Sequence, residues 1–212
     1  MQFHWRNPGY RDFDDFLATL TRDKRRKIRQ ERRRVAEQGV EVRRVAGSDI
    51  GDTDWEFFYR CHCRTYFDRG RSPYLNLDFF RRLGRTMPEA LLLVLAVKDG
   101  APIAAALDLL DDAALYGRYW GALEYVPGLH FEACYYQGIE HCIAEGLGVF
   151  EGGAQGEHKL ARGFEPVLTH SAHWLAEPRL ADAVARFLQR ETLGVADYID
   201  ELSEHSPFRR EA

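Results

Sequence analysis

The chain has 212 residues, of which 45% are apolar and 29% are charged, and its formal net charge at pH 7 is -4. This balance is ordinary for a globular protein and leaves enough chain for one domain with a sizeable core. A membrane span is not expected, because the longest purely apolar run covers only residues 90–97 and a span needs about 20.

Two further features bear on the compartment. No apolar stretch follows Met1, so no secretory signal is expected. The four cysteines do not have the spacing of a secreted disulfide framework; they are Cys61, Cys63, Cys134 and Cys142. We therefore expect a cytoplasmic, bacterial protein with free thiols.

The first part of the chain predicts helices on either side of one strand. Helical apolar spacing or capping signals mark helices, and period-2 alternation marks the strand. Thr21, Thr53 and Asn76 are the expected N-caps of the last three helices, and Gly39 is the expected stop of the second. The predicted helices cover residues 13–20, 22–38, 55–67 and 77–87, and the strand covers residues 40–45.

The middle of the chain predicts a three-stranded antiparallel meander over residues 91–97, 102–110 and 114–122. Turn residues Asp99, Gly100, Asp111 and Asp112 separate these strands. A switch from period 2 to period 3.6 then predicts a helix. The expected elements that follow are this helix at 131–147, strands at 149–151 and 167–175, and helices at 180–191 and 195–203.

This order of strands and helices predicts a mixed sheet flanked by helices, an α/β fold that is α+β by strand order. Several pieces of sequence form a combination more specific than any one of them alone. They lie at residues 22–29 with 39–42, 91–100 with 103–105, 115–121, 130–132 with 135–138, and 152–159 with 162–164. Together they resemble the FemAB-like branch of the GNAT acyltransferases, a branch associated with peptidoglycan.

The resemblance implies a GNAT-like acyltransferase domain over residues 1–176, with a C-terminal helical extension over 177–212 packed on it. Relatives in this branch usually carry two GNAT-like halves, and this chain resembles the second. The better-known Fem enzymes take an aminoacyl group from tRNA and add it to a peptidoglycan precursor. Before Phe131 the chain has the turn at 126–129 where typical GNAT enzymes have their coenzyme A pyrophosphate loop. Both acyl-CoA and aminoacyl-tRNA therefore stay open as co-substrates, and no tightly bound cofactor is expected.

The glycine-rich stretch 151–159 is the first candidate site. Glu157 and His158 can each take a proton from an attacking amine. Lys159 and Arg162 can hold a carboxylate or a phosphate. Backbone N–H groups of such a loop can also cradle an anion, and the further residues expected to contact a ligand there are Gln155 and Gly156. The alternative is a turn with solvated charges.

His130 and Glu132 mark the start of the predicted helix at 131–147. The structural interpretation is capping, with Glu132 favoured by the helix dipole in the first turn. The functional interpretation is that the helix start receives a phosphate or carboxylate while one of the two side chains acts on the amine. Both interpretations remain open.

The resemblance also implies a role for the strand before this helix, which splays in GNAT enzymes and polarises the carbonyl of the donor through a backbone amide. That would place Tyr119, Trp120 and Gly121 beside the reacting group, with Tyr119 able to protonate the leaving group; a core aromatic is the alternative. Arg118 and Tyr136 are the remaining residues expected to bind substrate or co-substrate.

The segment 22–34 carries nine cationic residues against Asp23 and Glu31. Such a run is usually a solvated face, but an RNA or phosphate partner would offset the repulsion among the cations and make binding salt-dependent. Lys24, Arg25 and Arg29 are the expected polyanion contacts. No His or Cys spacing points to a metal site, and Cys61-His62-Cys63 packs its donors too tightly for a zinc knuckle.

These observations predict an N-acyltransferase that moves an acyl or aminoacyl group to an amine without a metal. The expected partners are a small-molecule or peptide amine and, for an aminoacyl donor, tRNA; the sequence sets no oligomeric state. The alternative is a non-catalytic GNAT-like module that binds cell-wall peptide or nucleic acid, because a fold does not fix a function.

Overall fold

Tight turns and alternating apolar residues build the centre of the sheet. In the computed structural model, which describes residues 1–154 and 156–209, Asp99 and Gly100 have φ values of 50° and 75°. Positive φ at both positions suits a two-residue hairpin turn, and Gly100 adopts it without steric cost. This turn joins β3 (Leu91–Lys98) to β4 (Ala101–Leu110), and β4 in turn pairs antiparallel with β5 (Ala114–Ala122). The predicted meander is therefore confirmed.

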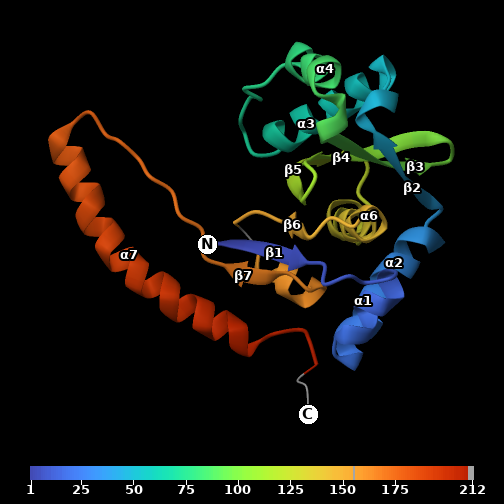
Figure 1. Cartoon of the computed structure of the whole chain (residues 1–212). Helices are drawn as coiled ribbons and strands as arrows, with labels where there is room; N and C mark the ends of the chain where they lie inside the picture. Colours follow the sequence, from blue (N-terminus) through green and yellow to red (C-terminus); the bar gives the residue numbers. More distant parts are fainter. Residues whose placement is uncertain (155, 210–212) are drawn as a thin grey trace.

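The meander forms part of a seven-stranded sheet in the order β2-β3-β4-β5-β6-β1-β7 (Figure 1). All neighbouring strands are antiparallel except β5 and β6, because the helical segment between them carries the chain across. The predicted mixed, mostly antiparallel sheet flanked by helices is confirmed. The other strands are β1 (Gln2–Arg6), β2 (Val40–Ala46), β6 (Val149–Glu151) and β7 (Glu165–Val167).

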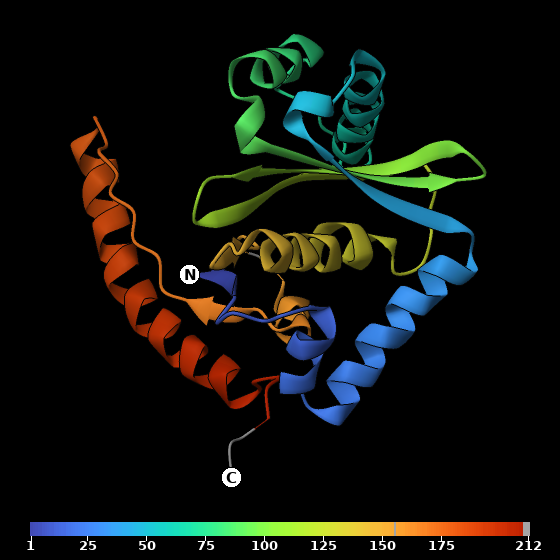
Figure 2. The same ribbon diagram turned by 45° about the vertical axis from the view of Figure 1, so that its right-hand side comes forward.

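Helices cover both faces of the sheet. On one face lie α3 (Asp52–Phe67) and α4 (Leu77–Thr86) (Figure 2). The sheet curls, so that a second set of helices lies between β2–β5 and the strands β6, β1 and β7 or beside them (Figures 1 and 2). This set comprises α1 (Phe13–Thr19), α2 (Arg22–Glu37), α5 (Leu129–Phe131), the π-helical segment η3 (Glu132–Tyr136) and α6 (Gln137–Glu145).

Each face has its own apolar core. Phe58, Phe80 and Leu93 are fully buried on the α3–α4 face. Trp5 and Phe150 belong to the larger core on the other face. Trp5 comes from β1, a strand that the sequence analysis did not predict.

The helix caps agree with the sequence in part. The Asn76 side chain accepts a hydrogen bond from the Phe79 N–H at 2.9 Å, which confirms it as the N-cap of α4. Thr53 does not cap α3, which begins after Gly51; there the Asp54 carboxylate accepts from the Gly51 N–H at 3.1 Å. Thr21 precedes α2 but makes no capping hydrogen bond through its side chain.

The C-terminal segment differs from the prediction in two ways. The strand expected at 167–175 is wrong, because β7 ends at Val167 and the exposed residues that follow are irregular. The two helices expected at 180–191 and 195–203 form one helix, α7 (Pro178–Glu204). Gly194 lies inside α7 and does not break it, since apolar residues such as Leu188 and Tyr198 continue one helical stripe across it.

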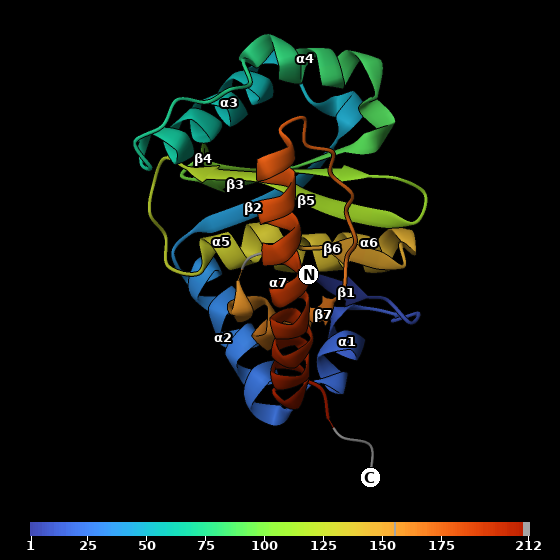
Figure 3. The same ribbon diagram turned by 90° about the vertical axis from the view of Figure 1, so that its left-hand side faces the viewer.

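The helix α7 runs along one side of the molecule (Figure 3). Leu202 near its C-terminal end is buried in the larger core, and Tyr198 packs against the same core. At its other end Leu180, Phe187 and Leu188 are exposed. Within the described part of the chain, no helix combines the length and apolar character that crossing a membrane demands.

We expect Gly121→Ala to destabilise the fold, because α3 approaches β5 very closely at this point. A Cβ atom on Gly121 would lie 2.0 Å from the carbonyl oxygen of Cys61, so the helix must move, at a cost of about 1–3 kcal/mol. Denaturant unfolding measures this loss. The matched control is Gly194→Ala in α7, where nothing lies within 4 Å; it should be neutral or stabilising by up to about 1 kcal/mol. Equal stability of Gly121→Ala and wild type would contradict the close approach.

Candidate active site

The strands β5 and β6 share only a short pairing. Their register joins Ala114, Leu115 and Tyr116 to Val149, Phe150 and Glu151, and β6 then ends. From Gly117 onward the edge of β5 that faces away from β4 is therefore not paired by β6. A strand that loses its neighbour in this way leaves backbone groups available to a ligand.

A bulge in β5 lies at the same place. Asp108 of β4 stands opposite Gly117 and Leu107 stands opposite Tyr119, so Arg118 is the extra residue. Bulges re-aim side chains and often lie next to active sites. The end of the β5–β6 pairing and the bulge in β5 lie together at the opening of a small cavity.

The cavity has a volume of about 140 Å³, room for a small group rather than a whole co-substrate. One wall is β5, a second is the start of the helical segment after it, and a third is β6 with the residue that follows. The lining residues are Asp108, Gly117, Arg118, Tyr119, Trp120, His130, Cys134, Tyr135, Phe150 and Gly152.

Two histidines and a tyrosine form a chain from this cavity to the surface. The Tyr135 hydroxyl lies 3.0 Å from Nε2 of His158 and 3.4 Å from Nε2 of His130. His130 and Tyr135 line the cavity, whereas His158 is exposed. These groups can pass a proton between the cavity and solvent. The π-helical geometry of η3 sets the position of Tyr135, and π-bulges often occur at functional sites.

Burial of His130, and partial burial of the His158 ring together with nearby cations, favour the neutral form of both imidazoles near pH 7. Burial lowers the pKa of His130 to about 4, and the nearby charges of His158, Arg162 and Lys159 add to the effect. The pKa of His158 is also lowered, first by burial and then by Arg162 and Lys159. Neutral imidazoles can accept a proton, so this environment favours a base.

Asp108 is a buried carboxyl in the wall of the cavity. Its side chain is 2% exposed, and its Oδ2 atom has no hydrogen-bond partner. Burial raises the pKa of Asp108 to about 8, and Arg118 opposes this shift weakly. The group is therefore mainly neutral at pH 7 while the cavity is empty.

Of the β5 residues expected at the site, Trp120 contacts His130, with ring centroids 5.4 Å apart in an edge-on arrangement. Tyr119 points to the opposite face, where its ring packs against Phe80 of α4. Burial and a hydrogen bond with Tyr74 raise its pKa to about 12. Tyr119 therefore borders the cavity while its ring packs in the core of the opposite face, and its role as acid for the leaving group stays a prediction.

Gly121 has a packing role. Its missing side chain admits the backbone of α3, as the 2.0 Å approach of the Cys61 carbonyl to a Cβ at this position shows. The Trp120 carbonyl next to it accepts a hydrogen bond from the Thr65 hydroxyl at 2.8 Å. These contacts fix the far end of β5 to α3.

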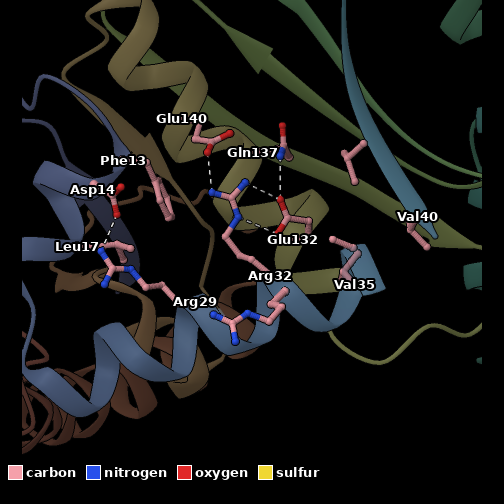
Figure 4. Close-up of a pocket in the computed structure, with 13 residues that line it drawn as sticks. Phe13, Asp14, Leu17, Arg29, Arg32, Val35, Val40, Glu132, Gln137 and Glu140 are labelled. Atoms are coloured by element: carbon pink, nitrogen blue, oxygen red, sulfur yellow. Dashed lines mark hydrogen bonds and ion pairs between the residues drawn. The ribbon is translucent and has the colours of Figure 1, made fainter. Parts of the chain in front are cut away.

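Glu132 points toward Arg32 of α2 (Figure 4), and it is not among the residues that line the small cavity. It is 5% exposed, and Arg32 donates to both its carboxylate oxygens at 3.0 Å. The Gln137 amide donates to the same carboxylate at 2.8 Å, and Arg32 reaches Glu140 at 2.6 Å. A carboxylate held in this way is a structural anchor, which differs from the role as general base expected of Glu132.

This ion cluster lines a hollow of about 550 Å³ between α1, α2, β2 and the η3–α6 segment (Figure 4). Apolar side chains such as Leu17, Val35 and Val40 form part of its wall. At its rim Arg29 pairs with Asp14 at 2.7 Å. This hollow and the small cavity have no lining residue in common, although residues of η3 contribute to both.

The glycine-rich loop contributes differently from the sequence prediction. Lys159 is 4% exposed; its ammonium lies 3.5 Å from the Gly153 carbonyl oxygen and 5.8 Å from the centre of the Phe3 ring. Gly156 has a φ of 107° and begins the short helix over Glu157–Arg162. The side chain of Glu157, and Gln155 as a whole, lie outside the described residues, so their predicted roles are not tested.

Arg162 and Tyr136 are also part of the interior. Arg162 is 3% exposed and donates to both carboxylate oxygens of Glu31 at 2.8 and 2.9 Å. Its guanidinium lies 3.4 Å from the centre of the Phe131 ring. The Tyr136 hydroxyl donates to the same Glu31 carboxylate, and its ring is fully buried. Both side chains tie the loop and η3 to α2, which differs from the ligand-binding roles expected of them.

The helix α2 divides its charges between two faces. Glu31 and Arg32 point inward to the ion pairs just described. On the outer face several cations border a surface hollow of about 720 Å³. The residues around it are Arg22, Arg25, Arg26, Arg29, Gln30 and Arg33; Lys24 is half-buried nearby.

The sequence profile of a family described as FemAB-like, peptidoglycan biosynthesis/recognition, matches residues 1–210. The chain belongs to the FemAB-like family. A search of curated protein sequences finds no match.

Solved structures show the fold that this FemAB-like chain shares. FemX matches with a TM-score of 0.56 and 12% identity over 82% of this chain and 55% of that one. L-PGS from Bacillus licheniformis matches with a TM-score of 0.51 and 10% identity over 71% and 45%. The C-terminal DUF2156 domain of a protein assigned as lysylphosphatidylglycerol synthetase, from Agrobacterium fabrum, has a TM-score of 0.51 and 12% identity over 76% and 49%. The chain thus spans about half the length of these structures.

Sequence reasoning did not find Asp108, Cys134 or Tyr135 as residues of the cavity. Asp108 interrupts an otherwise apolar strand, which was a usable signal for a buried polar group. Cys134 and Tyr135 lie on the π-helical segment η3, and no residue pattern predicts that geometry. In the parts of the chain that the structure describes, no three His, Cys, Asp or Glu side chains are grouped as metal ligands.

We expect Asp108→Asn to change how stability depends on pH. The unfolded carboxyl titrates near pH 4, whereas burial raises the pKa of the folded one to about 8. Between these values the unfolded state has released a proton that the folded state retains, so this residue makes stability fall as pH rises, by up to about 1.4 kcal/mol per unit. Between pH 5 and 8 the free energy of unfolding should fall less steeply with pH for Asp108→Asn than for wild type. The control is the exposed Asp112→Asn, and parallel curves for all three proteins would contradict the burial of Asp108.

We also expect the outer face of α2 to bind polyanions in a salt-dependent way. Heparin or tRNA affinity should fall steeply between about 50 and 200 mM salt, because each contact releases a counterion. Arg25→Glu with Arg26→Glu should flatten that slope. Arg186→Glu on α7 is the control for net charge. The prediction is contradicted if the affinity does not change with salt, or if Arg186→Glu weakens binding as much as the α2 variant does. The outer face of α2 would then be an ordinary solvated surface.

Proposed function

We propose that this chain transfers an acyl or aminoacyl group from an activated donor to an amine. The observation that carries the proposal is the open edge of β5, which faces a cavity lined by His130 and Tyr135. In such a site a backbone amide can stabilise the oxyanion that forms on the donor carbonyl. Membership of the FemAB-like family supports a peptidoglycan precursor as the acceptor.

The proposed reaction is direct transfer. The amine nitrogen forms a bond to the donor carbonyl carbon, and the bond from that carbon to the leaving oxygen or sulfur breaks. The amine loses one proton, and the leaving group gains one when it departs. Acyl-CoA and aminoacyl-tRNA are both donors of this kind, and neither requires a metal or a resident cofactor from the protein.

Within this scheme His158 is the base and acts through Tyr135. The Tyr135 hydroxyl, 3.0 Å from Nε2 of His158, takes the proton of the amine while its own proton moves to the imidazole. His130 lies on the other side of the hydroxyl at 3.4 Å and holds its orientation. The lowered pKa of His158 keeps the imidazole neutral and ready to accept.

Aminoacyl-tRNA as a donor would also give the outer face of α2 a role. That face carries exposed arginines and no acidic side chain among the residues around its hollow. A cationic surface of this kind suits the phosphate backbone of RNA. The proposal places the protein in the cytoplasm, where both classes of donor are made.

We expect His158→Gln and Tyr135→Phe each to lower turnover by about 10² to 10⁴, the range for loss of a general base. Phenylalanine keeps the ring of Tyr135, and His158 is exposed, so the melting temperature should change little in either variant. Because the two groups act in series, the double variant should be no slower than the slower single variant. In wild type the acidic limb of the pH–rate profile should lie below pH 6.5, since the pKa of His158 is lowered.

The control is His170→Gln, which changes an exposed histidine on the irregular segment after β7. It should leave both turnover and melting temperature unchanged. Full activity in both Tyr135→Phe and His158→Gln would refute the proposed chain. An absence of transfer with every donor tested, together with tight binding of cell-wall peptide, would favour a binding module.

A further inference from the structure

Asp108 is a buried carboxyl, and one of its oxygens has no hydrogen-bond partner. It lies on β4, one strand in from the open edge of β5, and reaches the cavity under the bulge at Arg118. A buried polar atom without a hydrogen bond destabilises a fold unless a ligand or a water completes it. The Oδ2 atom of Asp108 is such an atom.

The described groups around Asp108 do not form an ion pair with it. The guanidinium of Arg118 lies over the Tyr116 ring, 5.3 Å from its centre. Its charge lowers the pKa of Asp108 but does not outweigh the effect of burial. Cys134 and Cys142 are the other titratable neighbours, and burial raises the pKa of both thiols, which keeps them neutral. His130 across the cavity is neutral as well, because burial lowers its pKa.

Resting on the proposed transfer reaction, we propose that Asp108 binds a primary ammonium group of a substrate in this cavity. A carboxylate and an ammonium brought together away from water attract each other strongly, and an ammonium can donate to the unpartnered Oδ2. The cavity volume of about 140 Å³ suits a small group of this kind. A neutral group of the same shape would leave the carboxyl without its charged partner and should bind less well.

The shape of the cavity depends on Gly117. A Cβ atom there would lie 3.8 Å from Oδ1 of Asp108, 3.5 Å from the Phe150 ring and 3.6 Å from the Glu151 carbonyl oxygen. These are ordinary contacts, so alanine fits without strain while it occupies space next to Asp108. Gly117→Ala therefore fills part of the subsite without removing its charge.

The ammonium could come from either substrate of the proposed reaction. An aminoacyl donor carries an α-ammonium group next to its carbonyl. An acceptor amine arrives as an ammonium that gives up one proton to solvent before it attacks. The donor arm of the test compares 3′-alanylamino-3′-deoxyadenosine with its 3′-propionylamino counterpart, which lacks the amine. The acceptor arm compares Nα-acetyl-lysine amide with Nα-acetyl-norleucine amide.

Dissociation constants for all four compounds are measured by calorimetry or NMR titration on the full chain. We expect at least one ammonium compound to bind at least about tenfold more tightly than its neutral counterpart. Asp108→Asn should remove that preference and leave the neutral compound unaffected. Gly117→Ala should weaken both members of the preferred pair. Asp112→Asn, which changes an exposed carboxyl near the same strands, is the matched control and should behave as wild type.

The proposal is overturned if wild type shows no preference for an ammonium in either arm, if none of the four compounds binds, or if Asp108→Asn keeps the preference. The arm that shows the preference identifies the source of the ammonium. Because the readout is binding, the result is independent of turnover. A preference for the ammonium compound without any transfer would support the subsite and contradict the proposed reaction. Transfer that depends on His158, without any preference for an ammonium, would support the reaction and contradict the subsite.

Discussion

The parting of β5 from β6 is the constraint on which the rest of the site depends. A strand that pairs on both sides has no free backbone groups, so a sheet offers a binding edge in its interior only where one pairing stops. Here it stops after Tyr116, and the bulge at Arg118 turns the remaining strand. The helical segment that follows β5 must then cover the opening, which brings His130 and Tyr135 to it.

Two sets of ion pairs hold that covering segment in place. Arg32 binds Glu132 and Glu140, and the neighbouring Glu31 binds Arg162 and Tyr136. Removing one partner of such a buried pair leaves an uncompensated charge, which costs several kcal/mol, about 3–5 in measured cases. The same pairs fix the rotation of α2 about its axis and so decide which of its arginines face solvent. One helix thus positions both the segment that covers the cavity and the cationic surface.

The sequence predicted the meander, the helix after it and the mixed sheet, because turn residues and changes of hydrophobic period are local signals. It also marked His130 and His158 as site residues. It did not separate Glu132 and Arg162 from the site, since a charged side chain that anchors the interior looks the same in sequence as one that meets a ligand. Only the pairing across distant segments, such as Arg32 with Glu132, distinguishes the two. The sequence analysis grouped Tyr119 with Trp120, although neighbouring side chains of a strand point to opposite faces.

The attachment of α7 has a consequence for how the molecule opens. Near the end of this helix Leu202 is buried, and two backbone hydrogen bonds, from Thr21 to Pro207 and from Arg209 to Thr19, join the chain after it to the region of α1. At the start of the helix Leu180 and Phe187 have no such cover. Local unfolding follows the distribution of buried contacts. Amide hydrogens should therefore exchange at rates graded along α7, fastest near Pro178 and slowest near Leu202. The helix would then unfold from its N-terminal end while the rest of the fold stays intact.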